Sequence, residues 1–242
     1  MLLLRGRALV KTMRFQESRY IGDPINAVKV FSDLRADELV LLDIDATREK
    51  RSIPVDLVGA VGAEAAMPLA VGGGIGSIQQ IRELLAAGAE KVVLCTKAVE
   101  DPSFVRDASM TFGAPTIVVC LDVRTNVMRR PRVWSAGGTV SSRYAPIEFA
   151  KMMEDHGAGE LIVQSVDRDG SMSGYDIDML RRISDAVTIP VIALGGAGKL
   201  DDLRAAYSDG RASALAAGSL FVHHGHHRGV LISYPARSEL PF

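Results

Sequence analysis

The sequence is poor in cysteine, has almost no net charge and contains no long apolar run. It has 242 residues, two cysteines and a formal net charge of −1. Cys95 and Cys120 both lie inside apolar runs, which argues against a disulfide-stabilised secreted protein and favours buried thiols in a reducing compartment. A nearly neutral chain creates no overall field for nucleic acid or an anionic membrane, so any anion site must be built locally.

No membrane span or secretory signal is evident in the sequence. A span needs about 18 or more consecutive apolar residues, and a secretory signal needs an apolar stretch followed by a small-residue cleavage site. Because the chain has neither, we expect a cytoplasmic protein. Its length and 48% hydrophobic content suit one large core, so we expect a single domain over residues 1–242.

Short apolar runs alternate with stretches of helical period along the whole chain. Their continuity suits strands buried on both faces, and helix-start signals such as Asp23 with Pro24 lie between them. Eight such runs over this length predict an α/β fold of the (β/α)8 (TIM) barrel type, with an open doubly wound sheet as the alternative. The runs are MLLL, ELVLLDID, PLAVGG, KVVLCT, TIVVCLD, ELIVQSVD, PVIALGG and ASALAAG.

The chain also matches itself at a constant offset of 122 residues. Residues 36–45 then lie over 158–167, and residues 68–88 lie over 190–210. Since the same offset holds across two strand-helix units, we expect an internal repeat of two half-barrels, approximately 1–115 and 116–242.

Glycine-rich turns follow two of the matched runs, in GGGIGS and GGAGK. Glycine lets backbone N–H groups approach an anion closely, and a helix that begins nearby adds partial positive charge. Two such turns on one barrel face predict a ligand with a phosphate at each end; the alternative is that the glycines only make tight turns. The candidate phosphate-binding residues are Gly73, Gly74 and Thr96 on one side, and Gly195, Gly196, Gly218 and Ser219 on the other.

Carboxylates stand at the ends of three predicted strands: Asp43 and Asp45, then Asp122, then Asp167 and Asp169. A strand-end carboxylate that faces the open end of a barrel is placed for general acid or base catalysis. The alternative for each is a solvated loop acid or a helix cap.

Matching the first predicted strand to the fifth places MLLLR over CLDVR. Leu3 then stands where the second half has Asp122. If the ancestral site used a pair of carboxylates, one as acid and one as base, this chain has kept one of them.

Three charged residues stand at the opposite ends of predicted strands. Glu38, Lys91 and Glu160 each lie just ahead of an apolar run, so we expect them to gather around the N-terminal end of the barrel. Such charges either serve stability as a solvated face or control a passage or a partner surface.

Two further segments remain open. The run His223, His224, His226 and His227 has no acidic or cysteine partner nearby in sequence, so we expect no metal site there. Trp134 lies in a long excursion after the fifth strand, predicted to be a hairpin over the open end, as a lid or as packing.

Across essentially its whole length the chain resembles the cyclase subunit of imidazole glycerol phosphate synthase. The resemblance implies a (β/α)8 barrel with two phosphate sites, a phosphorylated ligand and no cofactor. It also implies a class I glutaminase on the N-terminal face, whose ammonia passes up the barrel to two catalytic aspartates. The motifs that carry it are DELVLLDID, PLAVGGGI, GAEKVVL, VVCLD, GAGELIVQSVDRDGSMSGYD and PVIALGGAGK.

By position, the resemblance makes Asp122 the second catalytic aspartate and Glu38, Lys91 and Glu160 an ammonia gate. Three residues depart from the family pattern: Leu3 replaces the first catalytic aspartate, Cys95 an asparagine and Gln164 a threonine. An arginine that precedes the first strand in the family has no counterpart. The positions implied to face the ligand are Lys11, Asp43, Gly73, Gly74, Asp169, Gly195 and Gly196.

A paralogous branch of that family is similar in its apolar LLL, in YIGDPINAVKVF and in FVHHGHHRGVLISYP. Its members resemble partners of a glutaminase that supply ammonia for amidating a sugar of bacterial surface polysaccharides, together with a separate sugar amidotransferase. We therefore expect retained ammonia handling with altered or lost cyclisation. The alternatives are a working cyclase of histidine biosynthesis and a silent scaffold that activates the glutaminase.

Overall fold

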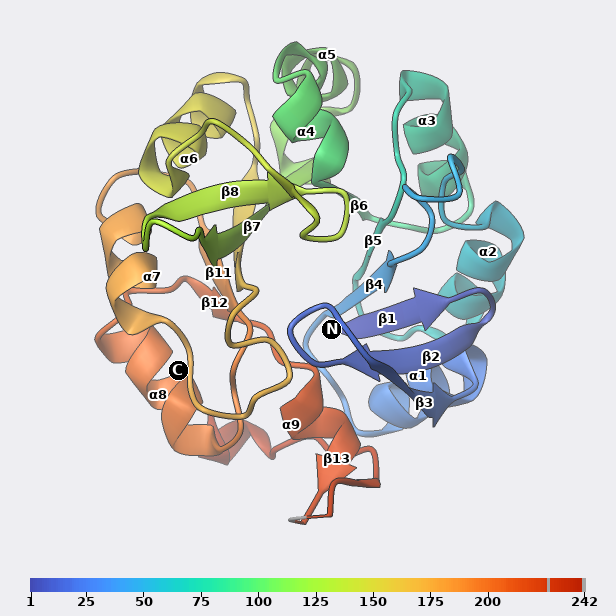
Figure 1. The fold of residues 1–242 in the computed structure, drawn as a ribbon. Helices are drawn as coiled ribbons and strands as arrows, with labels where there is room; N and C mark the ends of the chain where they lie inside the picture. The colour runs from blue at the N-terminus through green and yellow to red at the C-terminus, as the bar shows by residue number, and fades with distance from the viewer. Residues whose placement is uncertain (226, 241–242) are drawn as a thin grey trace.

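The computed structural model describes residues 1–225 and 227–240, and within them eight parallel strands curl into a barrel (Figure 1). Neighbouring strands pair in the order in which they occur along the chain. This order confirms the predicted (β/α)8 barrel over the open doubly wound sheet, whose strand order reverses partway. The barrel strands are β1 (Leu2–Arg5), β4 (Leu39–Asp43), β5 (Leu69–Gly72), β6 (Lys91–Leu94), β7 (Ile117–Thr125), β10 (Glu160–Ser165), β11 (Val191–Leu194) and β12 (Ala214–Leu215).

The last strand of the barrel is short, and the chain start completes the ring beside it. The amino nitrogen of Met1 donates a hydrogen bond of 2.7 Å to the carbonyl oxygen of Ala217, just after β12. Residues far apart in sequence therefore meet at the seam between the two half-barrels.

Helices surround the barrel and cover the outer face of the sheet (Figure 1). Their apolar faces pack on the outward-pointing strand residues in one large core. Asp23 caps the first helix by accepting a hydrogen bond from the Asn26 backbone, as its position before Pro24 predicted. The helices are α1 (Pro24–Asp33), α2 (Val55–Glu64), α3 (Ile78–Ala86), α4 (Thr96–Glu100), α5 (Ser103–Phe112), α6 (Pro146–Asp155), α7 (Ile177–Ser184), α8 (Leu200–Ser208) and the short α9 (Ser219–Val222).

The inward-pointing strand residues form a second, smaller core inside the barrel. Strand side chains alternate between the two faces of a sheet, so these residues come from alternate positions. Most are β-branched or small, as a narrow barrel interior requires. They are Val40, Ala70, Val93, Val118, Cys120, Ile162, Ile192 and Leu194.

The first strand of each half-barrel is followed by antiparallel strands. β2 (Ala8–Thr12) and β3 (Ser18–Gly22) follow β1, while β8 (Pro131–Ser135) and β9 (Val140–Ser141) follow β7. The hairpin predicted around Trp134 is therefore confirmed. A further small pair, β13 (His223–His224) with β14 (Gly229–Val230), follows α9, and two 3-10 turns lie at Ala114–Thr116 and Arg237–Glu239.

The repeat inferred from the sequence has a structural counterpart at the ends of the strands. Leu3 pairs with Leu42 in the first half, and Asp122 pairs with Gln164 in the second. The start of α3 matches the start of α8: the Gln80 side chain accepts from the Gly76 and Ser77 amides, and the Asp202 carboxylate accepts from the amides 122 residues later.

Among the described residues, none of the helices is both long and apolar enough to span a membrane.

Candidate functional site

A cavity of about 420 Å³ opens at the carboxyl ends of the barrel strands. We call it the central cavity. Both halves of the chain contribute to its wall, and the first half contributes polar residues such as Asp43 and Asp45 as well as the apolar Leu3 and Leu42. The residues that the argument uses are Leu3, Leu42, Asp43, Asp45, Gly73, Gly74, Cys95, Thr96, Cys120, Asp122, Gln164 and Asp169.

Asp122 lies on the cavity wall and is 7% exposed. The Cys95 thiol lies 3.4 Å from its Oδ2 and the Cys120 thiol 3.6 Å from its Oδ1. Burial raises the pKa of Asp122 to about 7, because these thiol hydrogen bonds offset only part of the desolvation penalty and Asp169 adds repulsion. A carboxyl group with this pKa is able to release and accept protons near neutral pH.

The two thiols beside Asp122 are themselves held in the neutral form. Burial, followed by the negative charge of Asp122, raises the pKa of Cys95 and of Cys120 well above the ordinary thiol value. A thiol that stays protonated is a poor nucleophile, so these cysteines act here as weak hydrogen-bond donors. The prediction of buried thiols is met by Cys120, whereas Cys95 is partly exposed at the cavity.

Leu3 lines the same cavity as Asp122, as the matching of the two strands predicted. It is 5% exposed and pairs in register with Leu42. The first half therefore presents two leucines where the second half presents an acid and an amide. A leucine cannot exchange a proton, so acid and base roles in this cavity cannot be shared between the two matched positions.

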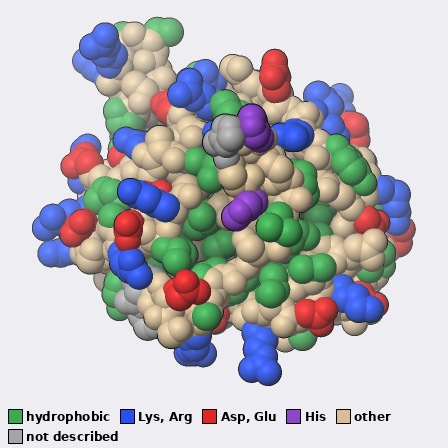
Figure 2. Space-filling model, turned by 90° about the horizontal axis from the view of Figure 1, so that it is seen from below, with side chains coloured by type: hydrophobic (Ala, Val, Ile, Leu, Met, Phe, Trp, Pro, Cys, Tyr) green, Lys and Arg blue, Asp and Glu red, His purple; other side chains and the backbone are tan. Residues whose placement is uncertain are grey.

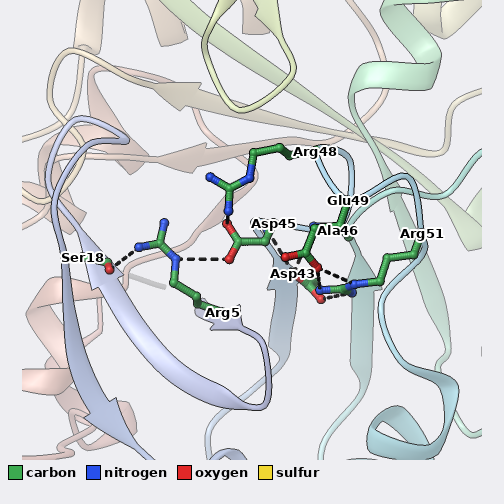
Figure 3. Close-up of polar contacts among 8 residues, drawn as sticks. All are labelled: Arg5, Ser18, Asp43, Asp45, Ala46, Arg48, Glu49 and Arg51. Carbon is green, nitrogen blue, oxygen red and sulfur yellow. Dashed lines mark hydrogen bonds and ion pairs between the residues drawn. The ribbon is translucent and has the colours of Figure 1, made fainter.

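The other carboxylates of the cavity wall are each paired with a cation, unlike Asp122. Asp43 accepts from Arg51 at 2.6 Å, and its second oxygen accepts from the amides of Asp45 and Ala46. These contacts, drawn in Figure 3, fold the loop after β4 beneath Gly74. Both oxygens of Asp43 are therefore engaged in holding this loop, and its role toward a ligand stays a prediction.

Asp45 and Asp167, which match in the repeat, both pair with an arginine. Asp45 is 6% exposed, forms an ion pair with Arg5 at 3.2 Å and accepts a hydrogen bond from Arg48 at 3.0 Å (Figure 3). The side chain of Asp167 is 48% exposed and lies 3.6 Å from Arg124. Asp167 does not line the central cavity, so the solvated-acid alternative describes it.

The first glycine pair, Gly73 and Gly74, lines the central cavity together with Thr96. Both glycines have positive φ, 119° and 65°, which favours glycine over any other residue. A Cβ atom on Gly73 would lie 2.5 Å from the Asp43 carbonyl oxygen. The backbone is therefore bare on this side of the cavity, as a phosphate contact requires.

The second glycine pair, Gly195 and Gly196, lines a separate pocket with Lys11, Asp169, Gly218 and Ser219. This pocket holds about 10 Å³, close to the space of one water molecule. Lys11 donates to Asp169 at 3.0 Å within this pocket, and Thr12, which lines the central cavity, donates to the other oxygen of Asp169 at 3.0 Å. The Ser219 hydroxyl is buried and has no hydrogen-bond partner among the described residues, so the pocket retains one unused polar group.

The charged trio, Glu38, Lys91 and Glu160, gathers at the opposite end of the barrel, as its position at the strand starts predicted. The Lys91 ammonium lies 3.1 Å from Glu38 and 2.8 Å from Glu160. Burial lowers the pKa of Lys91, but the hydrogen bonds that its ammonium group donates to Glu160 and Glu38 outweigh this effect and raise the pKa overall. The trio does not line the central cavity.

The described part of the histidine run begins directly after α9 (Figure 1), and Figure 2 shows histidine side chains on the face seen from below. Histidine side chains there lie among hydrophobic and basic ones. His223 and His224 form β13, and burial with the nearby Arg19, Arg228 and Lys11 lowers the pKa of His223. His226 lies outside the described residues, among which no cluster of three or more metal-binding side chains occurs.

Trp134 packs in the hairpin over the cavity. Its indole N–H donates to the Arg124 carbonyl at 3.1 Å, and the Arg124 guanidinium lies 5.2 Å from the ring. Both contacts lie within the β7–β8 pair, which fits the packing alternative.

Several residues of the site were missed by the sequence analysis. Arg51, Arg5 and Thr12 hold the three paired carboxylates, yet no motif marks them. One signal was available for Cys120: it precedes Asp122 by two positions in a strand, so both side chains face the same way.

Comparisons with known proteins agree with this geometry. The family model described as "Histidine biosynthesis protein" matches residues 2–228. A Pseudomonas aeruginosa protein provisionally named imidazole glycerol phosphate synthase subunit hisF2 is 42% identical over 239 residues, covering 99% of this chain and 95% of that protein. A Leptospira interrogans protein with a corresponding provisional HisF name is 39% identical (98% and 94% covered), and a Vibrio vulnificus protein provisionally named hisF3 is 40% identical (98% and 92% covered).

Proposed function

We propose, from the premise that the chain belongs to the histidine biosynthesis protein family, that it is an ammonia-using subunit of the imidazole glycerol phosphate synthase type. It receives ammonia from a class I glutaminase docked on the N-terminal barrel face. Cyclisation is altered or lost, and the ammonia serves the amidation of a sugar for surface polysaccharide, with a separate sugar amidotransferase as a further partner. The chain would act as one cytoplasmic domain of two half-barrels, 1–115 and 116–242.

The observation that carries this proposal is that Leu3 and Asp122, at matched positions of the two halves, line one cavity. Cyclisation with ring cleavage moves protons at more than one atom, and loss of a general acid or base commonly costs about 10²- to 10⁴-fold in rate. With Leu3 in place of a carboxylate, Asp122 has no matched partner in that exchange. Ammonia delivery needs no such partner.

The cavity suits a phosphorylated small molecule. The first glycine pair and Thr96 present backbone and hydroxyl donors to one phosphate, and the second glycine pair with Ser219 presents them to another. For a second phosphate to enter the smaller pocket, Lys11 must leave Asp169 and turn its charge toward the anion. Asp122, with a pKa of about 7, would accept or return a proton at the part of the ligand that lies between its two phosphate groups.

Ammonia would enter at the charged trio. Lys91 closes that end by contacting both glutamates, so a small displacement of its ammonium group opens a path into the barrel. Beyond it, the interior residues Val40, Ala70, Val93 and Val118 are apolar, which favours neutral ammonia over ammonium.

A complementation assay tests the altered chemistry. A histidine auxotroph that lacks its cyclase should not grow with this chain, even when a family glutaminase is supplied. Vigorous growth would favour the second candidate, a working cyclase of histidine biosynthesis, which Asp122 and the two glycine pairs support. Leu3→Asp should raise any cyclase activity, and no change would assign the loss to Cys95 and Gln164.

The gate is tested separately by Lys91→Ala. We expect glutamine hydrolysis by the partner to continue while the share of ammonia that reaches the acceptor falls. Arg211→Ala, which removes a surface ion pair with Asp185 outside the barrel, is the matched control. If coupling is unchanged, the trio serves only as a solvated charged surface.

Turnover by the barrel alone with added ammonium salt would contradict the remaining candidate, a silent scaffold that only activates the glutaminase.

A further inference from the structure

The side-chain nitrogen of Gln164 is buried at the central cavity. Gln164 is 1% exposed, and its Nε2 has no hydrogen-bond acceptor among the described residues. It lines the cavity from β10. An unused buried donor lowers the stability of the fold, so its presence at a cavity wall points to a ligand acceptor.

Gln164 lies between the acid and the second glycine pair. It pairs in register with Asp122 on β7, so the two side chains leave neighbouring strands toward the same face. On the other side, its Nε2 lies 3.2 Å from where a Cβ of Gly195 would be. A free N–H donor therefore stands next to a carboxyl group whose own contacts are two weak thiol donors.

The first half of the barrel provides an internal comparison. The position that matches Gln164 at the offset of 122 is Leu42, which pairs with Leu3 as Gln164 pairs with Asp122. In that half, a leucine occupies the equivalent strand position and faces the same side of the sheet. The fold therefore does not need an amide at this position, and the reason for Gln164 lies in what the cavity binds.

We propose that Gln164 binds the substrate and determines its specificity, by donating from Nε2 to an acceptor atom while Asp122 contacts an N–H group next to that acceptor. The complementary group is a planar amide, with its oxygen toward Gln164 and its nitrogen toward Asp122. Leu3 and Leu42 supply the apolar wall opposite. This inference rests on the proposed function only in placing the substrate in the central cavity.

The experiment compares Gln164→Leu with the unaltered protein in two measurements. The first is thermal unfolding: because the variant loses an unsatisfied buried donor, we expect its Tm to rise by about 2–4 °C. Ser184→Ala is the matched control and should also raise the Tm, because it removes a buried hydroxyl at the end of α7, outside the cavity lining, that has no partner in the described part of the chain.

The second measurement is binding of benzamide, an amide small enough for the cavity, followed by NMR. We expect the Gln164 side-chain resonance to shift, and the affinity to fall about 5- to 10-fold in Gln164→Leu but not in Ser184→Ala. N,N-dimethylbenzamide, which lacks the N–H group, should bind the unaltered protein more weakly than benzamide by a similar factor.

A lower Tm for Gln164→Leu, equal benzamide affinity in the two proteins, or no benzamide binding at all would each overturn the inference. Inorganic phosphate separates it from the proposed function. Shifts of the Gly73 and Gly74 amides with phosphate should persist in Gln164→Leu. If they are absent from the unaltered protein, the phosphate site fails while the benzamide result still decides the role of Gln164.

Discussion

The first strands of the two half-barrels carry side chains of different chemistry where they reach the cavity. In the first half Leu3 pairs with Leu42, and in the second half Asp122 pairs with Gln164, at matched positions of the repeat and around one cavity. The backbone that supports them is the same. A Cβ on Gly73 would lie 2.5 Å from the Asp43 carbonyl, and one on Gly195 would lie 2.6 Å from the carbonyl of Ser165, the residue that matches Asp43.

The difference separates what the fold needs from what the chemistry needs. Close backbone approaches at the strand ends are retained in both halves, and so are the matched ion pairs of Asp45 and Asp167. The side chains facing the cavity have diverged. Substitutions on the two halves should therefore give equal effects at the framework and unequal effects at the cavity.

The largest expected effect is that of Asp122→Asn on stability. The folded-state pKa of about 7 lies above the ordinary 3.8, so the folded protein holds a proton that the unfolded chain releases between these values. Stability therefore falls as the pH rises from about 4 to about 7, by at most about 4 kcal/mol. Asp122→Asn should remove this loss and be the more stable protein at pH 8.

Denaturant unfolding at pH 4 and pH 8 checks this prediction. The two proteins should have similar free energies of unfolding at pH 4 and should differ at pH 8. Leu3→Met, a change of similar volume on the other half, keeps Asp122, so its free energy of unfolding should differ from that of the unaltered protein by the same amount at both pH values. A difference of the same size at both pH values would mean that the carboxyl group is not titrating in the folded protein.

The next effect tests the shared framework. Gly73→Ala and Gly195→Ala should each cost about 1–3 kcal/mol, since both add a Cβ against a carbonyl oxygen at positive φ. Chemical unfolding of both variants measures the costs. Gly22→Ala, where a Cβ would meet no atom within 4 Å, should be nearly neutral. Costs that differ by more than twofold between the two halves would break the comparison.

The smallest effect concerns the matched ion pairs. Asp45 is buried between two arginines, so Asp45→Asn should cost about 1–2 kcal/mol, whereas Asp167→Asn on the exposed pair should cost at most about 0.5 kcal/mol. Salt sharpens the test, because 1 M NaCl should remove the Asp167 effect and leave most of the Asp45 effect. The reverse order would contradict the burial argument.

Much of the fold could be predicted from the sequence because it depends on local pattern. Continuous apolar runs mark buried parallel strands, and matching the first strand to the fifth, at an offset slightly different from 122 residues, placed Leu3 against Asp122 before any contact was known. The charged trio followed from its position at three strand starts. Each of these inferences needs only strand order and direction.

The partners of the site residues could not be predicted in this way. Lys11 meets Asp169 across 158 residues, and Arg51 turns back onto Asp43 within an irregular loop. Such contacts depend on loop conformation and side-chain rotamers, which carry no period. The unequal size of the two glycine-lined pockets has the same origin, since Lys11 fills one of them from a neighbouring hairpin.

The glycine turns that follow β5 and β11, one in each half, have one more implication. Hydrogen bonds between main chains, rather than the groups aimed at a ligand, hold these strand ends together. A repeated backbone of this kind can lose one cavity carboxylate by substitution and still fold. The fold can therefore be conserved after the original reaction is lost. Side chains of one half can then change to fit a new substrate while those of the other half stay the same.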